Sequence, residues 1–159
     1  HANRIPGGAM FNLPGPDLSA RHIGDALQGY REGAQLVVVA TTANSDAWLK
    51  PLTGKGRIII TATSAGDRDN ETELPTAFVE VLESTDSDVD GDGVLTVTEI
   101  FKASFAKVIK IYESGGFLIT EHPQLDGDGD GKASRRPAPA DAKGGEKAGL
   151  TIRRLQDFD

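Results

Sequence analysis

The sequence predicts an α/β fold, a three-layer sandwich built around a mainly parallel sheet. Two apolar, β-branched runs, residues 36–40 and 57–62, are typical of strands that are buried on both faces. A short helical stretch over residues 45–52 lies between them and carries Trp48, which we expect in the core. A strand, a crossover and a second strand indicate a parallel pair.

Patterns before and after these strands predict the helical layers. Residues 1–17 are rich in Gly and Pro and predict a loop, after which Asp17 caps a helix over residues 18–30. Apolar residues at helical spacing predict a helix from Pro75 to about Ser84 and an amphipathic helix over residues 98–113.

Two segments divide the chain. Residues 1–125 form the α/β domain, and residues 126–159 are predicted to be an Asp/Gly-rich loop followed by an irregular tail.

The formal charge is −7, from 24 acids and 17 bases. Eight of the acids lie in two short stretches: Asp86, Asp88, Asp90, Asp92 and Glu99, then Asp126, Asp128 and Asp130. The rest of the chain is nearly neutral, so the acidity indicates cation sites.

Composition excludes several classes of function. There is no basic stripe with interleaved aromatics, so nucleic acid is not expected as a partner, and no apolar run approaches the ~20 residues that span a bilayer. The chain has no Cys, which excludes disulfides, thiolate metal sites and a Cys nucleophile. It opens on a histidine instead of Met, which predicts that an upstream piece, with any signal peptide, has been removed.

Residues 88–99 match an EF-hand-type calcium loop. Calcium takes about six to eight oxygen ligands, and the loop supplies them from fixed positions. Carboxylates stand at the first, third and fifth positions, a glycine turns the chain at the sixth, a backbone carbonyl follows at the seventh, and Leu95 anchors the eighth. The ligands expected are Asp88, Asp90, Asp92, Val94 (carbonyl), Thr96 (directly or through water) and Glu99 (bidentate). We therefore expect Ca²⁺ as the cofactor.

The second acidic stretch matches only the first half of such a loop. Asp126, Asp128 and Asp130 stand at the first, third and fifth positions, but the twelfth would be Pro137, which has no ligand side chain. It is either a second cation site that borrows a ligand such as Asp141 or Glu146, or a solubilising loop. One complete loop between two helices indicates a structural clip instead of a sensor.

The order of several segments resembles the caspase and legumain-like cysteine peptidases, in particular their compact bacterial relatives. The segments are residues 11–18 (FNLPGPDL), 36–42 (LVVVATT), 57–63 (RIIITAT), 112–114 (YES) and 120–126 (TEHPQLD), which together span about residues 1–131. The resemblance implies an α/β sandwich that lacks its first strands, or receives them from a companion chain or segment.

The resemblance also places the family's catalytic residues. His1 falls near the family histidine, although it can equally be a residue left from a tag. Ala43 stands where the family has its cysteine, and a methyl group cannot act as a nucleophile. Ser45 lies two residues away as a substitute. The domain is thus either naturally inactive or a peptidase whose nucleophile was replaced.

Ligands of open parallel sheets bind beyond the carboxyl ends of the strands. Polar residues gather there, and the expected crevice residues are Thr41, Thr42, Asn44, Ser45 and Thr63. Three functions follow: a pseudopeptidase that binds a peptide or protein partner, a cysteine endopeptidase with a substituted nucleophile, or a calcium-stabilised structural or assembly module. Millimolar extracellular calcium suits an isolated loop, so an extracytoplasmic location is expected.

Overall fold

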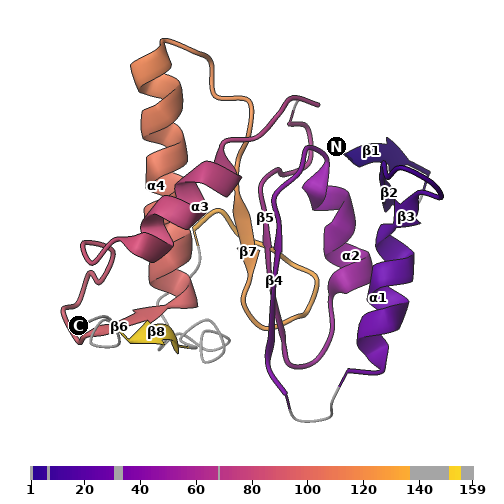
Figure 1. Ribbon diagram of the computed structural model, residues 1–159, viewed down its shortest axis with the longest axis horizontal. Helices are drawn as coiled ribbons and strands as arrows, with labels where there is room; N and C mark the ends of the chain where they lie inside the picture. Colours follow the sequence, from indigo (N-terminus) through magenta and orange to yellow (C-terminus); the bar gives the residue numbers. More distant parts are fainter. Residues whose placement is uncertain (1, 7, 31–33, 68, 137–150, 155–159) are drawn as a thin grey trace.

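The computed structural model describes residues 2–6, 8–30, 34–67, 69–136 and 151–154. Its central sheet contains β4 (Leu36–Ala40), β5 (Arg57–Thr61) and β7 (Gln124–Asp126), in the order β4-β5-β7 (Figure 1). β4 and β5 are parallel, as the sequence predicts, whereas β7 runs antiparallel to β5. The α/β class is therefore confirmed, and the described sheet is mixed instead of mainly parallel.

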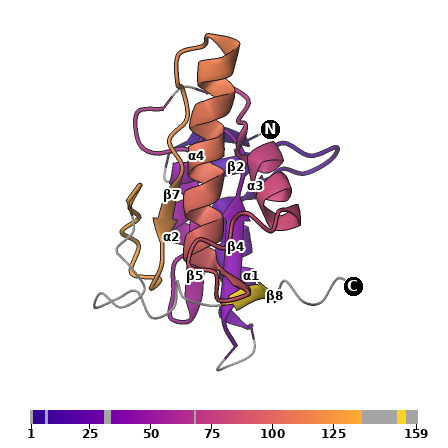
Figure 2. The ribbon, with the colours of Figure 1, turned by 90° about the vertical axis from the view of Figure 1, so that its left-hand side faces the viewer.

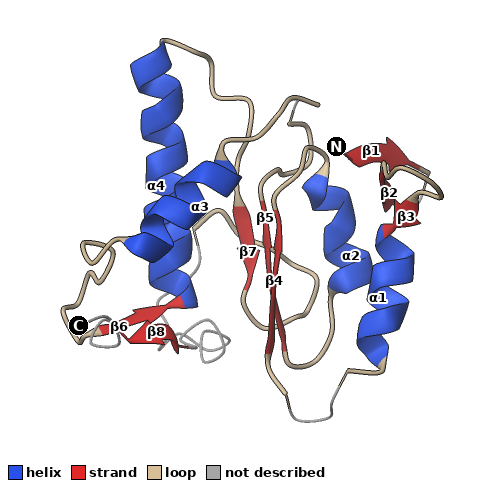
Figure 3. Ribbon diagram, in the orientation of Figure 1, coloured by secondary structure: helices blue, strands red, loops and turns tan. Residues whose placement is uncertain are grey.

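Helices lie on both faces of this sheet. α3 (Leu74–Glu83) and α4 (Val97–Gly115) cover one face, and α1 (Ala20–Gln28) with α2 (Leu49–Leu52) covers the other (Figures 1 and 3). A 3-10 turn, Ser45–Trp48, leads into α2. The view turned by 90° shows α4 in front with the strands behind it (Figure 2).

Successive side chains of β5 point to opposite faces of the central sheet, so this strand contributes to a core cluster on each face. Ile58 and Ile60 pack with Phe101 of α4 and other buried residues of α3 and α4. Ile59 points to the opposite face and joins the cluster of Trp48 and Leu52. β5 is buried on both sides because it is the central strand, which explains its unbroken apolar run.

The N-terminal segment differs from its predicted loop. Its three short antiparallel strands are β1 (Ala2–Ile5), β2 (Gly8–Phe11) and β3 (Leu18–Ser19). Phe11 contacts Trp48 edge-on, with 5.2 Å between the ring centroids, which attaches this sheet to the domain. The cap of α1 also differs: Ser19 caps the helix, while Asp17 accepts a hydrogen bond from the Leu13 amide at 3.3 Å.

The remaining helices follow the sequence pattern. Pro75 lies in the first turn of α3, and Gly116, in a left-handed conformation, is the C-cap of α4. β6 (Val94–Thr96) leads into α4 and pairs with β8 (Thr151–Arg154), so the predicted irregular tail contains a strand. Residues 137–150 and 155–159 lie outside the described residues. Within the described part, no helix is long and apolar enough to cross a membrane.

Candidate metal centres and the crevice at the sheet edge

The acidic loop between α3 and α4 is wrapped around the carboxylate of Asp88. Its Oδ1 accepts a hydrogen bond from the Gly91 amide at 2.8 Å, and its Oδ2 accepts one from Gly93 at 2.9 Å. Gly93 has a φ of 83°, which a residue with a Cβ rarely adopts, so the sharp turn needs glycine there. Further along, Asp92 Oδ1 accepts from the Val94 amide at 2.9 Å.

Glu99 closes the loop from its far end. As the third residue of α4 it forms a capping box with Thr96: its Oε2 accepts from the Thr96 amide at 2.9 Å and from the Thr96 hydroxyl at 2.8 Å. Its Oε1 accepts from the Val89 amide at 3.1 Å, across the loop. The start of the loop and the start of α4 therefore meet at one carboxylate.

Three carboxylates converge here. Oxygen atoms of Asp88, Asp90 and Glu99 all lie within 4.8 Å of one another, and Asp92 lies outside this group. The hydrogen bond from the Asp92 amide lowers the pKa of Asp90, but desolvation and repulsion from Asp92, Glu99 and Asp88 together raise it above its ordinary value. Such a concentration of negative charge can hold a metal ion.

The anchor of the loop lies in the core. Leu95, in β6, is fully buried and clusters with Val81 of α3 and Ile100 of α4. Val94, the predicted carbonyl ligand, occupies the same strand, and Thr96 is the N-cap of α4. The geometry of the loop is thus coupled to the packing of both helices.

The second acidic stretch repeats this local geometry. Asp126 accepts from the amides of Gly129 at 2.8 Å and Gly131 at 2.9 Å, the same spacing that joins Asp88 to its two glycines. Oxygen atoms of Asp126, Asp128 and Asp130 lie within 4.8 Å of one another, a second group that can hold a metal ion.

This second group differs from the first in its surroundings. Asp126 is buried at the end of β7 and also accepts from the Thr53 hydroxyl at 3.0 Å. Gly129 approaches the backbone so closely that a Cβ there would lie 2.1 Å from the Gly54 oxygen. Lys132 pairs with Asp130 at 3.3 Å. The borrowed ligands considered above, Asp141 and Glu146, lie outside the described residues.

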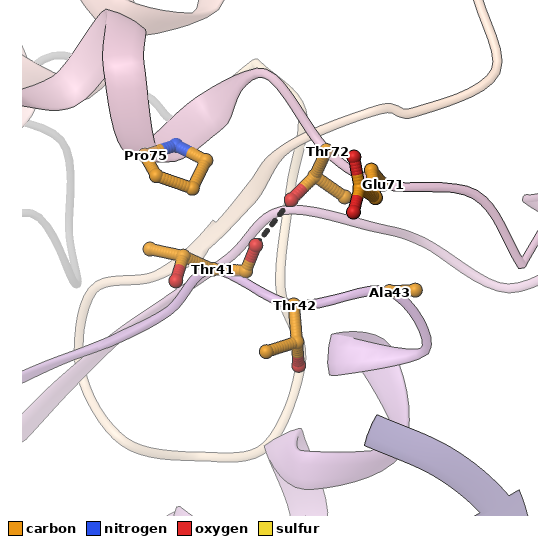
Figure 4. Close-up of a pocket in the computed structure, with 6 residues that line it drawn as sticks. All are labelled: Thr41, Thr42, Ala43, Glu71, Thr72 and Pro75. Atoms are coloured by element: carbon orange, nitrogen blue, oxygen red, sulfur yellow. Dashed lines mark hydrogen bonds between the residues drawn. The ribbon is translucent and has the colours of Figure 1, made fainter. Parts of the chain in front are cut away.

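A pocket of about 250 Å³ lies at the carboxyl end of β4. Figure 4 shows Thr41, Thr42 and Ala43 on one wall, with Glu71 and Thr72 facing them; Pro75 completes the lining. The Thr72 hydroxyl donates to the Thr41 carbonyl and holds the two walls together. The structure therefore brings Thr41, Thr42 and Ala43 around one pocket.

The other crevice residues make buried hydrogen bonds. Ser45 is 0% exposed, and its Oγ accepts from the Thr63 amide at 3.0 Å and lies 3.1 Å from the Thr63 hydroxyl. Asn44 adopts a φ of 56° and donates to Asp69 at 2.9 Å and to the Ala2 carbonyl at 3.3 Å. These residues hold the turn after β4 in place. His1 lies outside the described residues.

Two polar clusters were missed by sequence reasoning. Glu121 is 1% exposed and accepts from the Leu74 amide at 3.0 Å and the Tyr112 hydroxyl at 3.2 Å, so it caps α3 from another segment. Burial raises the pKa of Glu121, although its hydrogen bonds oppose this. His122 Nδ1 lies 2.6 Å from Asp67. Sequence reasoning found only the acidic stretches, because their residues are close together in the sequence. The contacts of Glu121 with Leu74 and of His122 with Asp67 join residues that are far apart in the sequence.

A comparison with known proteins found no matching family model, no matching curated protein and no matching solved structure. The site geometry is therefore the basis for assigning a function.

Proposed function

We propose that this chain is a calcium-binding domain in which the loop of residues 88–99 clips α3 to α4. The observation that carries the proposal is the convergence of Asp88, Asp90 and Glu99 within 4.8 Å. The raised pKa of Asp90 supports it, because a cation would relieve the repulsion between these carboxylates. Asp92, Val94 and Thr96 complete the ligand shell when the ion binds.

The donor atoms favour calcium over other metals. They are carboxylate, hydroxyl and carbonyl oxygens, which suit hard cations, whereas zinc and copper prefer nitrogen and sulfur. Magnesium demands a small octahedral cage at about 2.0–2.1 Å and keeps several waters. A loop that offers six ligand positions, one of them bidentate, suits the larger ion.

Calcium titration of the chelator-treated protein tests this proposal. We expect Glu99→Gln to weaken calcium binding on the order of a hundredfold, because changes to outer-shell partners alone cost about tenfold to a hundredfold. Glutamine still accepts the capping hydrogen bond from Thr96, so the helix start is preserved. Glu113→Gln, at an exposed position near the end of α4, is the matched control and should bind as the parent does. Equal affinities for both variants would refute the role of Glu99.

We further propose that the chain is a caspase and legumain-like three-layer domain that binds an extended peptide at the carboxyl end of β4. The pocket there supports this second part of the proposal. Ala43 stands at the pocket, so the domain holds a partner without cleaving it. Every residue of β4 is apolar and half-buried at the edge of the described sheet, which suits a companion chain or segment that adds a strand.

A cysteine endopeptidase with a replaced nucleophile is the second candidate, favoured by the position of Ala43 in the pocket lining. For this candidate, Ala43→Cys, with the companion segment supplied, is expected to cleave peptides. The parent chain is the control. Binding without turnover by Ala43→Cys would support the pseudopeptidase instead.

A calcium-stabilised assembly module in an extracytoplasmic location is the third candidate, supported by the lone complete loop.

A further inference from the structure

The β4 pocket contains one charged group among its described lining residues, and that group is negative. Glu71 is exposed on the wall opposite Thr42 and Ala43 (Figure 4). The rest of the lining consists of threonines, a methyl group and the Pro75 ring. Such a lining can pack along an aliphatic stem and offers a carboxylate at its rim.

No ion pair is found for Glu71 within the described residues. By contrast, Asp46 pairs with Arg4 at 2.7 Å, and Asp67 lies 2.6 Å from the Nδ1 atom of His122. Glu71 thus presents its charge to a ligand. Asp69 adds a second carboxylate close by, because it accepts from Asn44, the residue directly after Ala43.

The acidic wall is held in place before a ligand arrives. Thr72 is bonded to the Thr41 carbonyl, and Asp69 is bonded to the Asn44 side chain. The start of α3 could repel a cation through its helix dipole, but the Glu121 carboxylate accepts hydrogen bonds from the amides of Glu73 and Leu74 there. Among the described residues, Glu71 and Asp69 therefore give this side of the pocket a negative charge.

We propose that this pocket takes the guanidinium or ammonium group of a basic side chain, presented on an extended peptide. The inference rests on the proposed peptide binding at the carboxyl edge of the sheet. The methylene stem lies against Pro75 and the threonine methyl groups, and the cationic end pairs with Glu71. An acidic side chain is rejected by Glu71 and Asp69.

The test uses three matched peptides, Ac-Ala-Ala-Xaa-Ala-amide with Xaa arginine, citrulline or glutamate. Citrulline keeps the shape of arginine without its charge. Binding is measured by chemical-shift titration of the calcium-loaded protein. We expect the arginine peptide to bind about threefold more tightly than the citrulline peptide, the contribution of an ion pair with an exposed carboxylate. Added salt should reduce this preference.

Two variants assign the preference to Glu71. Glu71→Gln should remove the difference between arginine and citrulline, and Glu71→Lys should favour the glutamate peptide. Both changes are at an exposed position, so we expect the fold to tolerate them. Glu83→Gln, an exposed site at the opposite end of α3, makes the same charge change and should keep the parent preference.

The outcomes separate the two proposals. Equal binding of the arginine and citrulline peptides would overturn the charge preference and leave peptide binding at the edge intact. A preference for arginine that survives in Glu71→Gln would overturn the assignment to this pocket. If none of the three peptides binds, proposed peptide binding fails, and the inference fails with it.

Discussion

Glu99 connects two parts of the acidic loop through one side chain. It accepts hydrogen bonds from Thr96 at the start of α4 and from Val89 near the start of the loop. A carboxylate that is already held in this position needs little reordering when a cation arrives. Residue spacing in the sequence was sufficient to predict that Asp88, Asp90 and Glu99 converge, because the three lie within twelve consecutive positions.

Glu121 is the residue for which a pH dependence follows from the structure. Burial raises the pKa of Glu121 in the folded state above the ordinary value of 4.5, so protons bind this side chain more readily in the folded than in the unfolded protein. Its contribution to stability is therefore fully present below pH 4.5 and is lost as the pH rises through the folded-state pKa.

Glu121→Gln tests this dependence. Glutamine keeps the size of the side chain and can accept from the Leu74 amide, but it does not titrate. We expect the free energy of unfolding of the parent to fall, relative to that of the variant, as the pH rises from 4 to 8. Urea unfolding at several pH values measures the difference. A difference that does not change with pH would contradict the raised pKa.

At the scale of elements, the helices and the two apolar strands were predicted, and the other short strands were not. β4, β5, α3 and α4 carry continuous apolar runs or helical spacing, and all are confirmed. β1, β2 and β3 are two to four residues long, too short to show alternation, and they form through pairing and the Phe11–Trp48 contact. β7 ends inside an Asp/Gly-rich stretch, so composition pointed to a loop.

Leu95 tests whether the loop and the helices are coupled. Leu95→Ala removes a fully buried side chain between Val81 and Ile100, and we expect it to lower the free energy of unfolding by about 2–5 kcal/mol. It should also weaken calcium binding, because β6 carries the seventh to ninth positions of the loop. Val89→Ala is the control in the same loop: Val89 is 78% exposed, and its removal should change both quantities little. Denaturant unfolding and calcium titration of both variants give the answer. Unchanged calcium affinity in Leu95→Ala would contradict the coupling.

At the scale of the whole molecule, the two candidate sites are separated. The acidic loop lies beyond the C-terminal end of α3 (Figure 1). The β4 pocket lies at the other end of this helix, because Pro75 in the first turn of α3 lines it. The predicted parallel strands were enough to expect a crevice at the carboxyl end of β4. They could not show that Glu71 and Thr72 line it. These two residues lie about thirty positions along the chain from Thr41 and reach it only through the fold.

The central claim is that calcium stabilises the folded domain through Glu99. The most direct test is thermal unfolding of the parent and Glu99→Gln in calcium, in magnesium and in chelator. A hundredfold excess over Kd stabilises by about 2.7 kcal/mol, which predicts a rise in Tm of roughly 5–10 °C for the parent in calcium. We expect Glu99→Gln to lose this rise and magnesium to produce little of it. Coincident melting curves for the parent in all three conditions would contradict the claim.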